Sequence, residues 1–549
     1  MQNLTLDEET ILALPALTEI SQTQSLGEYF GKKVSSLKNI KQKNIENDIL
    51  TKAMVTEIAR LYGEEIAQQA HNQLTTLPII ETGTHLGAMK DYDNLQKDDV
   101  RASLHQNTII SASLLKSAGG NIHIGSYGSN VSLNHSFSGG YFQIGDELFQ
   151  TAPTKRINSN LLYNAPAISE DYFNPNVLIV AKLSGLRDIL KESEAPQEKA
   201  LLKCATELLA PIEKSKTNFA SFEKNYEKLN SGKKILINKA LTQLNSKQKE
   251  KTGVSFDEMD EQYAKLEKVF SRKELSLSDQ MALIQSQELN SITKPADITH
   301  VSIDALKVVK TFFIEALKNE DSLWAQIFNN KEMASKFHQE FVGVRSSWKE
   351  NESPFDFLRT DKGYTQTNPL PYGATDVDAK SLAKLLEEDK IVPSTALIVM
   401  AHQSADMLIH GGFFQSTYAK KIQDKFVDFL DKNQFTKYAD NIREIPSDVM
   451  LLSLSVAQKN GRPMKISEIS RLPDDKKQML IDNIPNHSSS LAVKKGLPYV
   501  SQYLEKTSPG YIASESKLNR AKKIRAQKII TIQNLMAQGR VRGVSASAR

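Results

Sequence analysis

Apolar residues recur every three or four positions along several stretches of this chain, a spacing that predicts amphipathic helices. From Asp48 to Gln73 the pattern is sustained across the whole segment. The segment from Gln106 to Gly120 is similar and stops at a double glycine, which is typical of a helix end. Further helices are expected across residues 300–350, 378–388 and 416–430.

Short runs of β-branched and apolar residues predict buried strands between these helices. The first, LPIIETGTHLG, begins at Leu77 and ends in a glycine turn. NPNVLIVAKL from Asn174 and IVPSTALIVMA from Ile391 are two further candidates. NIHIGSYGSNVSL and GGYFQIGDELFQ alternate between apolar and polar residues, as strands joined by tight turns do. Nine of the 25 glycines lie between Gly83 and Gly145, so this part of the chain makes the strictest demands on the backbone.

The composition changes from about Asp188 to Lys294, where Lys, Glu, Gln and Leu dominate. Apolar residues there keep a helical spacing without a long heptad repeat, which predicts a protruding helical hairpin or small coiled arm. A chain of 549 residues exceeds one ordinary core, so several domains are expected. The expected divisions are an N-terminal helical segment (1–75), the first half of an α/β core (76–187), the helical arm (188–294), the second half of the core (295–440), a mixed segment (441–510) and a basic helical tail (511–549).

The charge of the tail differs from that of the rest of the chain. The whole chain has a formal net charge of +4, but residues 511–549 hold nine Lys and Arg residues and one acid, Glu515. Between residues 514 and 537 the apolar residues fall mostly on one helical side. The tail is therefore either a helix docked on the protein with a solvated basic face, or a contact for an anionic membrane surface or RNA through residues 514–542.

The single cysteine, Cys204, excludes an intramolecular disulfide and a cysteine-based zinc site, and its surroundings predict a buried helical position. The N-terminus lacks the features of a secretory signal, and no stretch approaches the roughly 18 apolar residues of a membrane span. We therefore expect a soluble, cytoplasmic protein with no transmembrane segment.

Histidines cluster in the glycine-rich part of the chain. His85 follows the first predicted strand, where the loops of open α/β sheets bind ligands and free N–H groups suit an anion. His85 is therefore a candidate catalytic acid or base, with Thr82, Gly83 and Thr84 as ligand-binding residues. The alternative is that these are loop histidines near one another only in sequence. Five of the ten histidines lie in this region: His71, His85, His105, His123 and His135.

A second candidate site follows the strand predicted from Ile391. His410 is its candidate catalytic residue, and the helix expected from Ser416 directs the positive end of its dipole toward the same turn. The alternative is a tight turn between a strand and a surface helix. If both sites lie at strand ends, His85 and this turn should meet in one cleft. The candidate ligand-binding residues are Gly411, Gly412, Gln415 and Tyr418, with His402 nearby.

Several common signatures are missing from the sequence. It contains no P-loop, no GxGxxG after a strand, no GxSxG elbow and no kinase signature set. No histidine spacing typical of a metal site occurs either. The sequence therefore predicts no metal and identifies no cofactor.

Two parts of the chain resemble the bacillithiol synthase (putative cysteine ligase) family. TLPIIETGTHLG, followed by NTIISASLLKSAGG and a strand ending in SNVSLNH, is similar to that family's first β-α unit with its TGxxxG turn, here Thr82–Gly87. IVPSTALI and GGFFQSTYAKKI are similar to its second half, where a proline-containing strand leads to a glycine turn and a tyrosine helix. SYGSNVSLNH stands where the family has an acidic segment. The resemblance covers about a quarter of the chain and implies an α/β fold with a Rossmann-like core, a helical (coiled) arm and additional α-helical segments.

These observations favour an intracellular small-molecule enzyme of ligase or transferase type with an anionic substrate. Its anion-binding cleft is expected between residues 81–145 and 402–418. The alternative is a non-enzymatic interaction protein that acts through the helical arm and the basic C-terminal tail. The first hypothesis requires His85 and His410 to face one concave pocket.

Overall fold

The structure is a computed structural model, and its contacts divide the chain into two compact units. The first comprises Met1–Thr84, Asp91–Gly128 and Ser286–Arg549, and the second comprises His85–Lys90 and Ser129–Gln285. The structure describes residues 16–39, 44–82, 99–129, 141–150, 167–168, 173–214, 219–341, 358–359, 378–411, 413–449, 451, 456–459, 462–464 and 466–493.

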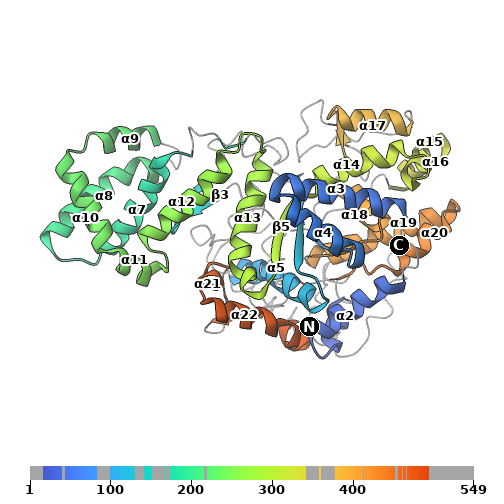
Figure 1. The fold of residues 1–549 in the computed structure, drawn as a ribbon, viewed down its shortest axis with the longest axis horizontal. Helices are drawn as coiled ribbons and strands as arrows, with labels where there is room; N and C mark the ends of the chain where they lie inside the picture. Colours follow the sequence, from blue (N-terminus) through green and yellow to red (C-terminus); the bar gives the residue numbers. More distant parts are fainter. Residues whose placement is uncertain are drawn as a thin grey trace, which may run out of the picture. The chain divides into compact units, whose positions relative to one another are not determined.

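The first unit is built around a four-stranded sheet in the order β5–β2–β1–β8. Figure 1 labels β5 of this sheet. Every neighbouring pair is parallel, so the carboxyl ends of the strands meet at one edge. In chain order these are the third, second, first and fourth strands of the sheet. Successive strands are therefore added on one side up to β5, and the chain then crosses back to place β8 against β1. The bounds are β1 (Ile79–Thr82), β2 (Ile122–Tyr127), β5 (Thr299–Asp304) and β8 (Leu408–His410).

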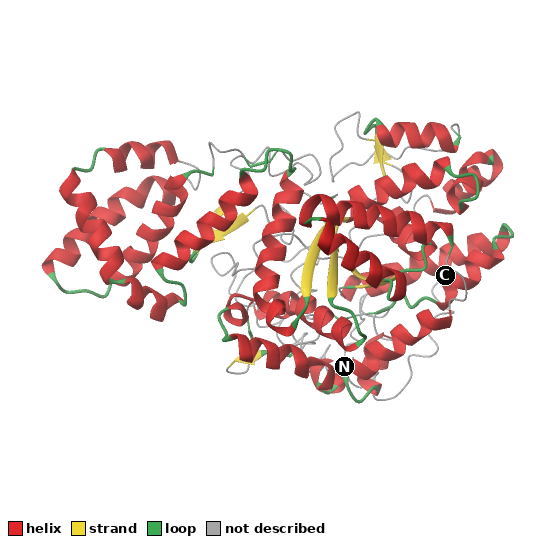
Figure 2. Ribbon diagram, viewed as in Figure 1, coloured by secondary structure: helices red, strands yellow, loops and turns green. Residues whose placement is uncertain are grey.

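Helices make up most of the first unit (Figure 2). They are α2 (Leu26–Ser35), α3 (Ile45–Tyr62), α4 (Glu64–Thr76), α5 (Asp99–Ser117), α14 (Ala305–Lys318), α15 (Leu323–Asn329), α16 (Lys331–Phe341), α17 (Ala379–Glu387), α18 (Thr395–Ser404), α19 (Phe413–Lys432), α20 (Thr436–Glu444), α21 (Ile466–Ser470) and α22 (Asp474–Asn483). Three 3-10 turns are η1 (Ser36–Asn39), η4 (Lys294–Ala296) and η6 (Ile484–Asn486). Two small antiparallel pairs are β6 (Leu358–Arg359) with β7 (Ile391–Val392), and β9 (Gln458–Lys459) with β10 (Arg462–Pro463).

Side chains cover the outer edge of β5, which is the end strand of this sheet. An unpaired strand edge can associate with other chains, and these side chains prevent that by occupying its backbone groups. Asn290 donates from Nδ2 to the carbonyl of His300 and accepts the His300 N–H at Oδ1, both at 2.8 Å. The N–H of Ser302 donates to the hydroxyls of Tyr62 and Ser286 at 3.0 and 2.9 Å. These bonds fix the position of β5 and of the two polar residues, His300 and Ser302, that it contributes to the site.

An aromatic cluster fills the core between α14–α16 and α18–α19. Trp324 at its centre is fully buried, and its Nε1 donates to Ser404 Oγ at 3.1 Å, which satisfies the one polar group of the indole. Its ring neighbours are Phe313, Phe328, Phe337 and Phe426.

The second unit consists of a hairpin and a set of short helices with their own aromatic core. Phe142 on the hairpin contacts Phe173 and Phe270 at ring-centroid distances of 5.4 Å. The longest described helix of this unit has 19 residues, and the described helices give no support for the coiled coil expected in this part of the chain. The elements are β3 (Tyr141–Ile144), β4 (Glu147–Gln150), α7 (Pro175–Leu190), α8 (Pro196–Lys214), α9 (Phe219–Glu227), α10 (Ser231–Gln243), α11 (Asn245–Thr252) and α12 (Phe256–Phe270); α13 (Leu277–Thr293) begins in this unit and ends in the first.

Much of the expected secondary structure is confirmed. The helix from Gln106 is the C-terminal part of α5, the run after Leu77 forms β1, and the helices expected over 378–388 and 416–430 are α17 and α19. A mixed α/β structure is therefore present, with far more helix than strand.

Three expectations about strands were wrong. The run from Asn174 forms helix α7: Asn174 caps it by accepting the Asn176 N–H at 2.9 Å, and Pro175 begins it, which is a common helix start. The run from Ile391 gives only two strand residues before Ser394 caps helix α18. Residues 299–304, which begin a stretch expected to be helical, form strand β5.

Candidate active site

Four ionisable side chains, one from each strand, share a face of the parallel sheet. The register pairs Glu81 with His410 and His123 with His300, and Glu81 also pairs with Gly125, two residues after His123. Since side chains alternate between the two faces of a strand, all four point to the same side. Each of the four is at most 1% exposed. The other face carries mainly apolar residues: Ile80, Ile122, Ile124, Val301, Ile303 and Ile409.

A continuous series of hydrogen bonds links the three histidines through two serines. Ser111 Oγ on α5 lies 2.6 Å from His123 Nε2 and 3.2 Å from His410 Nε2. The Nδ1 atoms of His123 and His300 lie 2.7 Å apart, and His300 Nε2 lies 2.9 Å from Ser302 Oγ. We call these five residues, Ser302–His300–His123–Ser111–His410, the histidine chain.

Glu81 is attached to the middle of the histidine chain. Its Oε1 accepts hydrogen bonds from Asn107 Nδ2 at 2.8 Å and Thr108 Oγ1 at 3.1 Å, both on α5. Its Oε2 lies 3.3 Å from His123 Nε2 and has no hydrogen-bond partner among the described residues. Burial raises the pKa of Glu81 to about 8, and the bonds from Thr108 and Asn107 act in the opposite direction. At neutral pH the carboxyl group is therefore protonated.

The histidines of this site are neutral imidazoles at neutral pH. Burial lowers the pKa of His300 and of His410 to about 3. Burial also lowers the pKa of His123, which is reduced further by the neighbouring His300 and His410. The network therefore holds no net charge at pH 7, which is how a polar cluster of this size avoids the cost of a buried ion.

With neutral imidazoles, two arrangements of hydrogens complete the chain and also use the Ser111 hydroxyl hydrogen within it, because each ring carries one N–H and each hydrogen bond needs one hydrogen. In the first, His123 donates to His300 from Nδ1, accepts from Ser111 at Nε2, and His410 donates to Ser111 from Nε2. His410 Nδ1 then has a free lone pair, and we call this the base order. In the second, every hydrogen is reversed and His410 Nδ1 carries the hydrogen; we call this the acid order.

The structure places some of the sequence-predicted site residues side by side. His410 ends β8, Gly411 follows it, and the neighbouring β1 ends at Thr82, whose Oγ1 donates to the His410 carbonyl at 3.5 Å. Tyr418 lies one to two turns into α19, and burial raises its pKa to about 12. Gly83, Thr84, His85 and Gly412, and the side chain of Gln415, lie outside the described residues. The meeting of His85 with the glycine turn therefore stays a prediction.

The sequence predicted separate sites for His123 and His410, and it did not predict that His300 belongs to a site. The missing signal was the alternation of THVSID, residues 299–304, just before a strongly periodic helix. His402, expected to line the second site, is instead a core residue of α18 whose Nδ1 donates to the Ile398 carbonyl at 2.6 Å. Cys204 on α8 is partly exposed and not fully buried as expected, and partial burial raises its pKa.

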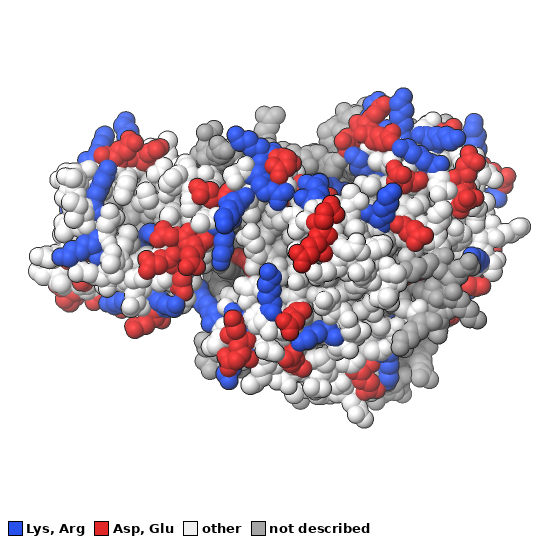
Figure 3. All heavy atoms as spheres, viewed as in Figure 1, with Lys and Arg blue, Asp and Glu red and all other residues white. Residues whose placement is uncertain are grey.

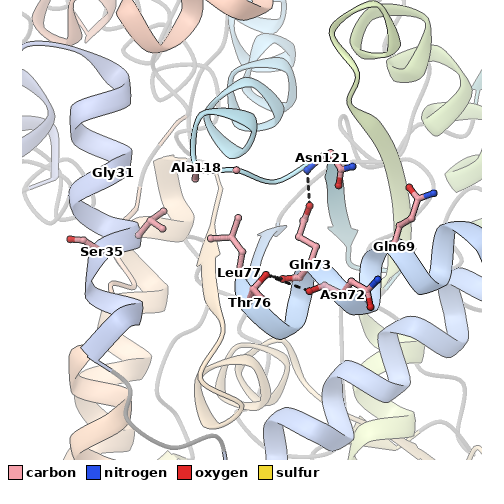
Figure 4. Close-up of a pocket in the computed structure, with 11 residues that line it drawn as sticks. Gly31, Ser35, Gln69, Asn72, Gln73, Thr76, Leu77, Ala118 and Asn121 are labelled. Carbon is pink, nitrogen blue, oxygen red and sulfur yellow. Dashed lines mark hydrogen bonds between the residues drawn. The ribbon is translucent and has the colours of Figure 1, made fainter.

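A cavity of about 650 Å³ lies at the opposite, amino end of the sheet (Figure 4). Its walls include Leu77, just before β1, and Asn121, just before β2. Figure 4 shows Gln73 spanning from α4 to the Asn121 N–H, a bond of 2.8 Å. Uncharged side chains line it, so it offers no acid or base: Val34, Ser35, Gln69, Asn72, Gln73, Thr76, Leu77, Ala118 and Asn121, with Gly31 and Gly119.

The described residues contain no cluster of His, Cys, Asp and Glu side chains suited to a metal ion. Apart from His410 Nδ1, the ring nitrogens of the histidine chain face one another or serine hydroxyls and do not converge on a common point. No described helix has both the length and the apolar character needed to span a bilayer. Family models, curated proteins and solved structures give no match to this chain. Geometry and chemistry therefore carry the functional argument.

Proposed function

We propose that this protein is an enzyme acting on a small anionic molecule, and that His410 exchanges a proton with that molecule through Nδ1. The observation that carries the proposal is the position of this atom. It belongs to the last residue of β8, it is buried, and it has no hydrogen-bond partner among the described residues. A buried polar atom without a partner costs stability, so its retention at a strand end points to a ligand.

The order of the strands supports the same location. Open parallel sheets bind ligands outside the carboxyl ends of the strands, at the point where the strand order reverses. Here that point lies between β1 and β8, where Thr82 and His410 are neighbours. The order third, second, first, fourth is also that of the first four strands of a Rossmann-like sheet, and we propose this architecture for the core.

The start of α19 supplies the second requirement, a place for negative charge. This helix has 20 residues and begins at Phe413, three residues after His410. The first N–H groups of a helix have no partner within the helix, and they favour an anion beside them. A substrate with its anionic group at this terminus brings its reacting atoms toward His410.

The histidine chain gives a proton accepted by His410 a route away from the substrate. When a substrate proton reaches Nδ1, the Nε2 hydrogen passes to Ser111, and the Ser111 hydrogen passes to His123 Nε2. The positive charge then resides on His123 and not at the substrate, 3.3 Å from the Oε2 of the Glu81 carboxyl group, which is neutral at pH 7. General base catalysis of this kind contributes roughly 100- to 10,000-fold in rate.

Ligase or transferase chemistry is the form of this reaction that we propose, because a base can activate the nucleophile of such a reaction by removing its proton. The resemblance to the putative cysteine ligases makes L-cysteine the first nucleophile to test. His85 remains a candidate partner of His410 in this reaction.

The experiment compares the wild type with His410→Gln. Glutamine places its amide near the position of Nε2 and keeps a partner for Ser111, but leaves nothing at Nδ1. Both proteins are incubated with a small-molecule cell extract, with and without added L-cysteine, and mass spectrometry follows consumption and product formation. We expect wild-type turnover of an anionic compound at least 100-fold faster than with H410Q.

His402→Gln is the matched control, because it removes another buried histidine that is not part of the histidine chain. It should keep the turnover of the wild type. Equal turnover by folded H410Q and wild type would remove the proposed role of His410. An absence of turnover in all arms would favour a non-enzymatic function.

One observation favours such a second function, an interaction with an anionic membrane surface through the second unit. Ile235 and Leu236 on α10 are 64% and 59% exposed. Lysines and no acids accompany them on this helix, namely Lys233, Lys234 and Lys239, and Figure 3 shows lysine and uncharged atoms over it. Apolar residues flanked by cations are typical of a helix that inserts into an anionic bilayer surface. The basic tail lies outside the described residues, and its contact with a membrane or RNA stays a prediction.

Co-sedimentation with vesicles tests this second function. The wild type should sediment with vesicles of phosphatidylcholine and phosphatidylserine but not with phosphatidylcholine alone, and less at high salt. Replacing Ile235 and Leu236 with serine should abolish most of this binding. Met479→Ser, which removes an exposed apolar residue of the first unit, should not. Equal binding by the wild type and the double variant would exclude α10 as the contact.

A further inference from the structure

We infer that Glu81 is a positioning residue that sets the direction of the histidine chain, so that its ionised form selects the acid order and its protonated form selects the base order. His410 then presents Nδ1 as a hydrogen-bond donor in one state and as a proton acceptor in the other. The catalytic consequence rests on the proposed function, whereas the coupling between Glu81 and His410 is a property of the ligand-free protein.

The Nδ1 atoms of His123 and His300 are in contact and share one hydrogen. His123 and His300 approach at 2.7 Å through like atoms, so one hydrogen lies between them and belongs to one ring. If His123 holds it, His123 Nε2 is bare; if His300 holds it, the hydrogen of His123 is on Nε2. The tautomer of His123 is therefore the variable that distinguishes the two orders.

The second step is the transmission of that variable to His410. Ser111 has one hydroxyl hydrogen and lies within 3.2 Å of both His123 Nε2 and His410 Nε2. When His123 Nε2 is bare, Ser111 donates to it, and His410 satisfies the other contact by donating from its own Nε2. When His123 Nε2 carries the hydrogen, Ser111 accepts it. The Ser111 hydroxyl has no other hydrogen-bond partner among the described residues, so its own hydrogen goes to a bare His410 Nε2. The tautomer of His410 thus follows that of His123.

The third step is the bias that Glu81 applies. Its Oε2 lies 3.3 Å from His123 Nε2, and no hydrogen bond with a described residue holds this oxygen. A negative charge at that distance in a buried site stabilises the tautomer with hydrogen on Nε2, which is the acid order. A neutral carboxyl group removes that attraction. Because Oε1 accepts two hydrogen bonds, the hydrogen of the neutral carboxyl group lies on Oε2, where it opposes a second hydrogen on Nε2, and this favours the base order.

Among the described residues, the groups that face Glu81 are uncharged. They are Asn107 and Thr108 from α5, His123 from β2 and His410 from β8. Because burial raises the pKa of Glu81 to about 8, the carboxyl group is protonated at pH 7 and ionises as the pH rises through about 8. The base order therefore holds on the acid side of this transition and the acid order on the alkaline side.

The test is the ring ¹⁵N spectrum of the full-length protein labelled with ¹⁵N-histidine, recorded without ligand. A bare ring nitrogen resonates far downfield of one that carries hydrogen, so each tautomer is read directly. In the wild type, His410 should carry its hydrogen on Nε2 at pH 7 and on Nδ1 above the Glu81 transition. Glu81→Gln, which has no ionised form, should keep the base order at both pH values.

Ser111→Ala tests the transmission separately. It removes the link between the two rings, so His123 should still change tautomer with pH while His410 does not. Ser113→Ala is the matched control: Ser113 is also a buried serine of α5, but it donates to the Ile481 carbonyl at 2.6 Å outside the histidine chain. In S113A the tautomer of His410 should change with pH as it does in the wild type.

Two results overturn the inference: a His410 tautomer that does not change across the Glu81 transition, or one that still changes in S111A. Failure of the proposed function is distinguishable from both. If H410Q retains turnover while the His410 tautomer follows Glu81, the proposed catalysis fails and the coupling stands. If turnover depends on His410 but its tautomer ignores Glu81, only the coupling fails.

Discussion

His123 and His300 face each other across the β2–β5 pair through their Nδ1 atoms, 2.7 Å apart, with their ring planes inclined by 27° and their centroids 4.9 Å apart. The two residues are 177 positions apart in the sequence, and strand register alone brings them together. The contact needs one Nδ1 with a hydrogen and one without, which two neutral rings supply, and burial lowers the pKa of both rings. The fold therefore limits this pair to arrangements with a single shared hydrogen.

His402 gives the stability of the protein a pH dependence that can be isolated. Burial lowers its pKa from 6.5 to about 4, so the unfolded chain binds a proton at higher pH than the folded chain. The contribution of the neutral His402 ring to the stability of the protein is complete above about pH 6.5 and is lost as the pH falls toward 4. His402→Gln should reduce the slope of unfolding free energy against pH by about 1.4 kcal/mol per unit between about pH 5 and 6. Urea titrations measure this slope. His71→Gln, an exposed residue of α4, is the control, and equal slopes for H402Q and wild type would contradict the expectation.

Gln73 should be among the polar residues on which the sheet depends most. From α4 its Oε1 accepts the N–H groups of Asn121 and Ile122, both at 2.8 Å, and its Nε2 donates to the Ile122 carbonyl at 2.6 Å. Gln73→Ala leaves these backbone groups without their partner and should lower the free energy of unfolding by about 3 kcal/mol. Gln69→Ala, an exposed change on the same helix, should stay within about 0.5 kcal/mol of the wild type. Chemical denaturation measures the free energy of unfolding of both variants. Similar losses in Q73A and Q69A would contradict the expectation.

Two glycines of the first unit should respond to alanine in opposite directions. A Cβ at Gly120 would lie 2.8 Å from Leu115 Cγ and 2.9 Å from Gln73 Oε1, so Gly120→Ala should cost about 1–3 kcal/mol. A Cβ at Gly31, inside α2, meets nothing within 4 Å, and Gly31→Ala should stabilise the protein by about 0.5–1 kcal/mol through helix propensity. Thermal unfolding measures the change in stability of both variants. A G120A protein more stable than the wild type would contradict the expectation and show that the turn after α5 adjusts easily to a side chain.

The helices were largely predictable because their apolar spacing is local information. Strands were harder, since a short apolar run suits a buried strand and a buried helix equally well. The run from Asn174 became α7, although the Asn–Pro helix start was visible in the sequence. His410 was singled out from its glycine turn, but its link to His123 and His300 depends on strand order and register. No spacing along the chain encodes those, so the site could be predicted only in fragments.

The protonation state of the three chain histidines at pH 7 tests the central claim most directly. Ring ¹⁵N spectra of the wild-type protein show the protonation state of each ring without any substrate. Single histidine variants assign the signals. The account predicts three neutral rings in the base order, with hydrogen on Nδ1 of His123 and on Nε2 of His300 and His410. An imidazolium at any of the three, or hydrogens on the Nδ1 atoms of both His123 and His300, would contradict it.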